Sequence, residues 1–92
     1  MKVVLEIKKR NKDYGIITWP YSLDFDIKTL FEQKVIIDFQ FEKEKLTRKI
    51  SYKYRKIAFG KTRLKNLEDA KYISLSKENN IIRIKESKSI KG

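Results

Sequence analysis

Alternation of apolar and polar residues is clearest between residues 34 and 54 of this 92-residue chain. A first arm, residues 35–42, and a second arm, residues 46–54, each place apolar side chains on one face and polar ones on the other. This period of two is typical of a half-buried strand. The apolar positions are Val35, Ile37, Phe39 and Phe41 in the first arm and Ile50, Tyr52 and Tyr54 in the second. The two arms predict a β-hairpin with one buried face.

The alternation also limits how the two arms pair. A turn over residues 43–44 places Phe41 opposite Leu46 and Ile37 opposite Ile50. A shift by one residue would exchange the buried and exposed faces, whereas a shift by two residues would preserve them. The pattern therefore predicts which side chains are buried and leaves the shifted register open.

Shorter alternating stretches precede this hairpin. Residues 2–10 predict a strand, and residues 15–19 predict a strand that returns from a turn at residues 11–15, where Asn, Asp and Gly favour a left-handed backbone. Pro20 would end the second strand because proline donates no hydrogen bond to a ladder. The predicted core positions of the first strand are Val3, Leu5 and Ile7.

The phase of the alternation changes after the central hairpin. Residues 52–59 begin with tyrosines on one face and end with Ile57 and Phe59 on the other, which predicts a β-bulge near Arg55. Beyond a corner at Gly60, residues 61–65 return to alternation and predict a further strand. Its basic side would hold Lys61, Arg63 and Lys65.

A final hairpin joins residues 72–76 to residues 81–85. Asn79 and Asn80 suit its turn because asparagine tolerates a positive φ. Its buried face would hold Ile73, Leu75, Ile82 and Ile84. Residues 87–92 carry one apolar side chain, and we expect them to form a frayed basic tail.

Residues 24–32 show the spacing of a short helical turn rather than a strand. The apolar residues on its shared face would be Ile27, Leu30 and Phe31. Trp19 and Phe25 are close enough in sequence to join this cluster, and Asp26 is the predicted N-cap. Asp24 and Asp26 could instead serve a metal ion or an acid–base pair. Two carboxylates without a third ligand favour the capping role.

The same segment resembles a family of small bacterial domains of unknown function. Its members carry Trp-Pro-Asn-Gly-x-Asp-x-Asp-Pro-x-x-Leu-Tyr near the end of an α+β domain. This chain has Trp19-Pro20, Asp24, Asp26 and Thr29-Leu30-Phe31, nearer its amino terminus. It departs from the motif at Tyr21, Ser22, Ile27 and Phe31. The resemblance implies a bacterial α+β domain with a capped turn and implies no chemistry.

Together these signals predict one α+β domain, mostly β, over residues 1–86. About six strands and one or two short helical turns would form a curled antiparallel sheet or a small open barrel. The chain has no cysteine and no histidine, which removes disulfides, thiol catalysis and the usual general base. Its apolar runs are too short for a membrane span or a secretory signal. We expect a cytoplasmic protein with no cofactor, no metal and no membrane contact.

Positive charge is concentrated in one segment. The net charge is +11, and residues 43–65 hold ten basic side chains and one acidic one, whereas residues 1–42 sum to zero. A clustered basic segment favours an anionic partner. A solvated, lysine-rich surface would produce the same composition without any partner.

The predicted function is a non-enzymatic binding module whose basic hairpin surface holds RNA or DNA through the phosphates. Lys49, Lys53 and Arg55 would alternate along one strand edge. Tyr52 and Tyr54 could stack on unpaired bases, or their rings could belong to the core face. The predicted nucleic-acid contacts are Arg48, Lys49, Lys53, Arg55, Lys56, Lys61, Arg63 and Lys65.

Two other functions stay open at this point. The basic hairpin could dock an acidic protein, as an inhibitor or an antitoxin-like regulator. A small basic ribonuclease toxin would have to work without histidine. Its candidate residues are Arg48, Lys53, Tyr54, Arg55 and Arg63. Because the chain has no glycine-rich phosphate loop and no catalytic triad motif, we assign no catalytic residue.

Overall fold

The computed structural model describes residues 1–65, 67 and 70–88, and places seven strands of these residues in two sheets. The larger sheet has five strands in the order β1-β6-β7-β3-β4, and the smaller one is a two-stranded ribbon of β2 and β5. The strands of the larger sheet are β1 (Lys2–Glu6), β6 (Tyr72–Glu78), β7 (Ile81–Ser87), β3 (Ile36–Phe41) and β4 (Glu44–Lys49). The ribbon consists of β2 (Ile16–Thr18) and β5 (Lys56–Ala58).

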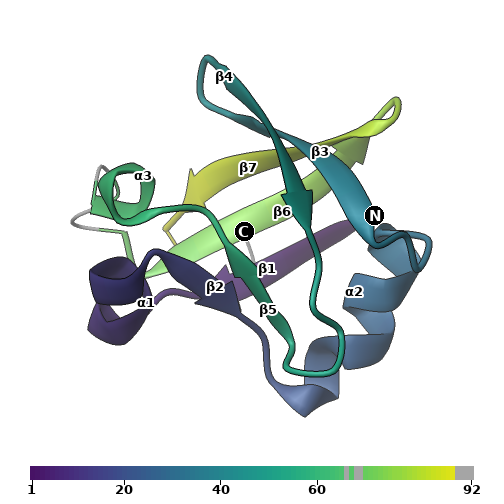
Figure 1. Cartoon of the computed structure of the whole chain (residues 1–92), viewed down its shortest axis with the longest axis horizontal. Helices are drawn as coiled ribbons and strands as arrows, with labels where there is room; N and C mark the ends of the chain where they lie inside the picture. Colours follow the sequence, from purple (N-terminus) through teal and green to yellow (C-terminus); the bar gives the residue numbers. More distant parts are fainter. Residues whose placement is uncertain (66, 68–69, 89–92) are drawn as a thin grey trace.

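Short helices lie at two ends of the molecule. They are α1 (Lys9–Tyr14), the 3-10 helix η1 (Tyr21–Leu23), α2 (Asp24–Leu30) and α3 (Lys61–Lys65). In Figure 1, α1 and α3 lie side by side at one end, α2 lies at the other, and the ribbon crosses between them. The predicted α+β, mostly β class is confirmed, and the large sheet is not closed into a barrel. It is not wholly antiparallel either, because β3 and β7 run parallel.

The core lies between one face of the large sheet and the elements that cover it. Phe39 of β3 is fully buried, and its ring contacts Phe31 at the end of α2 and Phe59 just after β5. The ring centroids are 5.8 and 5.0 Å apart, and both pairs are edge-to-face, the geometry that the charge distribution of aromatic rings favours. Phe39 therefore joins the sheet to both of its covering layers.

The central hairpin confirms the predicted faces, since Ile37, Phe39 and Phe41 are buried. Its register is the one shifted by two residues: Phe39 pairs with Leu46 and Phe41 with Glu44. The predicted turn over residues 43–44 is wrong. The chain turns at Glu42 and Lys43 instead, with Glu42 in the left-handed region at φ 56°.

The second arm of the hairpin ends earlier than predicted. β4 stops at Lys49, and residues 51–56 form a tight turn in which Ser51 pairs with Lys56 and Arg55 has φ 51°. This turn, not a β-bulge, produces the change of phase in the sequence. It also moves Tyr54 to the surface, where 64% of the residue is exposed. Val35 is wrongly assigned to the core as well, since it is half exposed.

The amino-terminal segment confirms the core positions Val3, Leu5 and Ile7 and corrects the elements predicted after them. The expected turn at residues 11–15 is helix α1, and β2 pairs with β5 instead of β1. Asn11 accounts for the helix, because its Oδ1 accepts the Lys8 N–H at 2.8 Å while its Nδ2 donates to the Ile16 carbonyl at 2.9 Å. One side chain thus fixes the start of α1 and attaches it to β2.

The segment after Gly60 is a helix, not the predicted basic strand. In α3 the side chains of Lys61, Arg63 and Lys65 do not form one row, and Leu64 is fully buried. The buried leucine explains the difference, since a five-residue segment with one apolar side chain can anchor a helical turn as readily as a strand.

The final hairpin is confirmed. It turns at Asn79, which has φ 58°, and its register places Leu75 opposite Ile84. All four predicted core residues are buried: Ile73, Leu75, Ile82 and Ile84. Ser87 still belongs to β7, opposite Tyr72, and residues 89–92 of the expected tail lie outside the described residues.

Helix α2 confirms the buried cluster of Ile27, Leu30, Phe31 and Trp19. Asp26 is not its N-cap: Leu23 holds that position and makes no side-chain capping bond. Asp24 contributes instead, accepting the Trp19 indole N–H at 3.0 Å and pairing with Lys28 Nζ at 2.9 Å. Phe25, expected in the cluster, is 78% exposed on the opposite side of the helix turn.

Replacing Phe39 by alanine tests the role of its ring. Because the side chain is fully buried against two other rings, Phe39→Ala should lower the free energy of unfolding by about 3–5 kcal/mol in a urea melt. The matched control is Phe25→Ala, where the ring is exposed and the change should stay within about 0.5 kcal/mol. Similar losses from both variants would contradict this account of the core.

Acid stability tests the role of Asp24. The hydrogen bond from Trp19, and then that from Lys28, lowers the pKa of the Asp24 carboxyl. A carboxylate with a lowered pKa stabilises the folded state above its unfolded pKa of about 4, and this contribution disappears as the pH falls through the folded pKa.

Asp24→Asn should therefore be less stable than the wild type at neutral pH and lose less stability between about pH 4 and pH 2. Urea melts at a series of pH values measure both effects. Asp26→Asn is the control and should follow the wild-type profile. A rise in melting temperature on adding Mg²⁺ or Ca²⁺ would contradict a purely structural role for these aspartates.

Candidate nucleic-acid interface

The outer face of the ribbon is the floor of the candidate site. Ile17 and Ile57 are buried beneath it. The alternate residues point outward in two pairs, with Ile16 opposite Ala58 and Thr18 opposite Lys56. The floor is therefore narrow and made mostly of short side chains.

Two concavities adjoin over this floor. One, of about 470 Å³, lies beside α1 and is lined by Lys8, Arg10, Asn11, Tyr14, Ile16, Thr18 and Lys56. The other, of about 600 Å³, lies beside the end of β4 and is lined by Ile16, Lys49, Ile50, Ser51, Tyr52, Lys53, Lys56 and Ala58. Because Ile16 and Lys56 line both, the two concavities adjoin, and together we call them the ribbon groove.

The ribbon groove differs from other hollows of the molecule in its charge. Its basic residues are Lys8, Arg10, Lys49, Lys53 and Lys56, and no acidic side chain among the described residues lines it. Two further hollows mix both signs: one includes Glu42 and Glu86, the other Glu32 and Asp38, each with basic neighbours. The positive potential of the ribbon groove is thus not offset by acidic groups in its walls.

Three of the predicted basic contacts line this groove: Lys49, Lys53 and Lys56. The predicted stacking residue Tyr52 lines it as well. Lys49, Lys53 and Arg55 do not follow one strand edge as expected, because Lys53 and Arg55 lie in the turn after β4. Lys8 and Arg10 were missed. Their segment sums to zero charge, and only the local run Lys8-Lys9-Arg10 could have indicated them.

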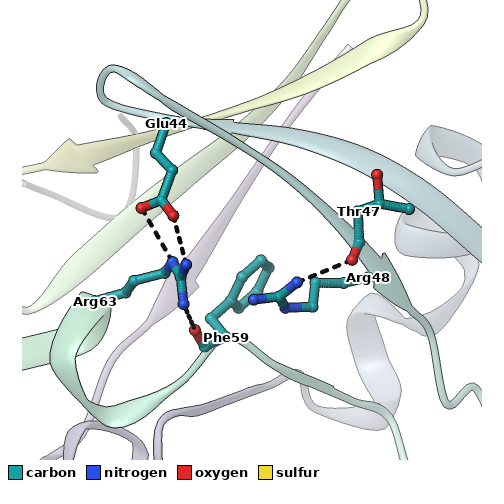
Figure 2. Close-up of polar contacts among 5 residues, drawn as sticks. All are labelled: Glu44, Thr47, Arg48, Phe59 and Arg63. Atoms are coloured by element: carbon teal, nitrogen blue, oxygen red, sulfur yellow. Dashed lines mark hydrogen bonds and ion pairs between the residues drawn. The ribbon is translucent and has the colours of Figure 1, made fainter.

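Arg63 has a different role. In Figure 2 its guanidinium faces Glu44 of β4, with Nη2 and Nε donating at 2.5 and 3.2 Å, while Nη1 donates to the Phe59 carbonyl at 3.0 Å. The bond from Arg63 lowers the pKa of Glu44, and the carboxylate raises the pKa of Arg63. This bidentate contact holds α3 against β4, and with the Phe59 bond it engages three of the five N–H donors of Arg63.

The remaining predicted contacts lie outside the groove. Arg48 Nη1 donates to the Thr47 carbonyl of its own strand at 3.0 Å (Figure 2), and the Arg55 guanidinium lies 5.8 Å from the Tyr21 ring centroid. Lys61 and Lys65 are exposed on α3. Of the residues considered for a ribonuclease, Lys53 and Tyr54 lie together, with the Lys53 ammonium over the Tyr54 ring.

The two candidate stacking tyrosines differ in their surroundings. The Tyr52 hydroxyl donates to the Lys34 carbonyl at 2.5 Å, its ring meets Trp19 edge-on, and burial raises its pKa to about 12. Tyr54 is exposed, and the ammonium groups of Lys53 and Lys56 each lie 5.4 Å from its ring centroid. Tyr52 supports the wall of the groove, whereas Tyr54 presents a ring to solvent.

A close backbone contact positions the α1 wall of the groove against its floor. The Gly15 carbonyl accepts the N–H groups of Phe59 and Gly60 at 2.8 and 3.0 Å. A Cβ on Gly15 would lie 2.3 Å from the Gly60 carbonyl carbon, so no larger residue fits without displacing the backbone. This contact joins the end of α1 to the end of β5 and fixes the distance between them.

Among the described residues, no group of three or more acidic side chains could hold a metal ion. No helix in the described part of the chain is long and apolar enough to cross a membrane.

Comparison of the chain with protein-family models, with curated proteins and with solved structures finds no match. The family resemblance of residues 19–31 therefore stays a prediction.

Substitution of Gly15 tests the close contact. Gly15 has a positive φ, and Gly15→Ala adds a Cβ that collides with the Gly60 backbone. We therefore expect the free energy of unfolding to fall by about 1–3 kcal/mol or more in a denaturant melt. Gly60→Ala is the control: it shares the positive φ, but the nearest atom to its Cβ is the flexible Arg63 Nη1 at 3.3 Å. Gly15→Ala should be the more damaging of the two, and equal losses would contradict the collision.

Proposed function

We propose that the ribbon groove binds nucleic acid through its phosphates, and that the chain acts as a binding module in the cytoplasm. The observation that carries this proposal is the lining of the groove: five basic side chains, with no acidic one among the described residues. Each phosphate that a lysine or arginine neutralises releases counterions, which favours binding at low salt. The absence of cysteine fits a reducing compartment.

The basic side chains are placed to contact a charged backbone. Lys8 and Arg10 come from the α1 side of the ribbon, Lys49 and Lys53 come from the β4 side, and Lys56 lies between them on the floor. Cations on both sides of a narrow floor match a chain of phosphates better than they match one isolated anion.

The proposed binding does not depend on the nucleotide sequence. Direct readout needs side chains with donors and acceptors aimed at base edges. The amide of Asn11, which lines the groove, is occupied by Lys8, Ile16 and Thr18. Lysine acts here as a point charge rather than as a shaped donor. The groove therefore favours affinity for the backbone over selection among sequences.

Neutralising the β4 wall and the floor of the groove tests the proposal. The variant Lys49→Gln, Lys53→Gln, Lys56→Gln should bind a fluorescent RNA or DNA of about 16 nucleotides more weakly for every sequence tried. The slope of the logarithm of affinity against the logarithm of salt concentration should fall by about two to three units. Fluorescence anisotropy between about 50 and 200 mM salt measures both.

The matched control is Lys43→Gln, Lys45→Gln, Lys85→Gln, which removes the same charge from exposed positions outside the groove. It should retain most of the affinity. Equal losses from both triple variants would mean diffuse attraction with no site. No binding by the wild type at about 50 mM salt would overturn the proposal and make an acidic protein the better candidate partner.

A further inference from the structure

Two exposed tyrosines border the ribbon groove. Tyr14, at the end of α1, lines one concavity and is 62% exposed. Tyr54 is 64% exposed and contacts Lys53 and Lys56, both of which line the other concavity. Both rings are thus largely open to solvent beside the basic groove, in contrast to Tyr52, whose hydroxyl and ring are both held by the protein.

The contacts of Tyr54 would change when phosphates enter the groove. In the free protein, the ammonium groups of Lys53 and Lys56 rest against its ring. An exposed cation–π contact is weaker than the stacking of a base on a ring. Phosphates that attract the two lysines would therefore leave a ring face open for a base.

The floor of the groove suits bases as well as phosphates. Ile16 and Ala58 are opposite each other on the ribbon and present apolar atoms between the basic walls. A duplex would meet this floor only with its phosphates and sugars, because its bases are stacked inside. An unpaired strand can bring base faces to both the floor and the bordering rings.

We propose that the ligand class of the ribbon groove is single-stranded nucleic acid, with unpaired bases stacked on Tyr54 and Tyr14. This inference rests on the proposed function, since it names the kind of nucleic acid that the same groove holds. It adds a dependence on bases, which phosphate contacts alone do not have.

An abasic strand separates the two contributions. Fluorescence anisotropy would compare three ligands of equal length, about 12 nucleotides each: oligothymidylate, an abasic strand with the same phosphates, and a duplex. The wild type should bind oligothymidylate about tenfold or more tightly than the abasic strand, as expected for one stacked base. It should also prefer oligothymidylate to the duplex, although the duplex has the higher charge density.

Tyrosine variants assign the effect to the two rings. Tyr54→Leu and Tyr14→Leu should each reduce the preference for oligothymidylate over the abasic strand. Tyr54→Phe should retain the preference because it keeps the ring. Tyr21→Leu is the matched control, since Tyr21 is 79% exposed but outside the groove.

Equal affinity of the wild type for oligothymidylate and the abasic strand, or tighter binding of the duplex, would overturn the stacking inference and leave phosphate binding intact. A preference that survives both leucine substitutions would also overturn it. No binding of any of the three ligands would overturn the proposed function together with the inference.

Discussion

The edge-to-face contact of Phe39 with Phe31 and Phe59 is the interaction on which the rest of this fold depends. A sheet with one apolar face must be covered, and here the cover comes from two separate pieces, α2 and the ribbon. Phe39 touches the end of one and the segment just after the other. Directly after Phe59, Gly60 meets Gly15. The position of the ribbon groove thus depends on how one buried ring is packed.

The basic segment that dominates the charge of this chain is divided by residue type. All three of its arginines make directed contacts within the protein: Arg55 with the Tyr21 ring, Arg63 with Glu44, and Arg48 with the carbonyl of the adjacent Thr47. Three of its lysines, Lys49, Lys53 and Lys56, face the groove. The division agrees with the chemistry of the side chains. The planar guanidinium makes directed contacts with carboxylates, carbonyls and rings, whereas the ammonium is a mobile point charge suited to phosphates.

The sequence predicted the features that depend on local pattern and missed those that depend on tertiary contacts. Alternation identified the buried faces of both confirmed hairpins, but a shift by two residues preserves a face, so it could not select the register of Phe39 and Leu46. The helix α1 was missed because Asn11, Asp13 and Gly15 also suit a turn, and the bond from Asn11 to the Ile16 carbonyl forms only once β2 is in place. Likewise, no pattern within residues 43–65 indicates that Lys8 and Arg10 complete the groove.

The strand order has a consequence for how the chain is made. β7 occupies the middle of the large sheet, between β6 and β3, although it is the last described strand along the chain. During synthesis, β1 and the β3–β4 hairpin emerge first, and their edges stay unpaired until β6 and β7 emerge. Unpaired edges are templates for wrong partners. Misassembly is therefore most favoured while β7 is still enclosed by the ribosome or unpaired, and much less so once β7 has joined β6 and β3.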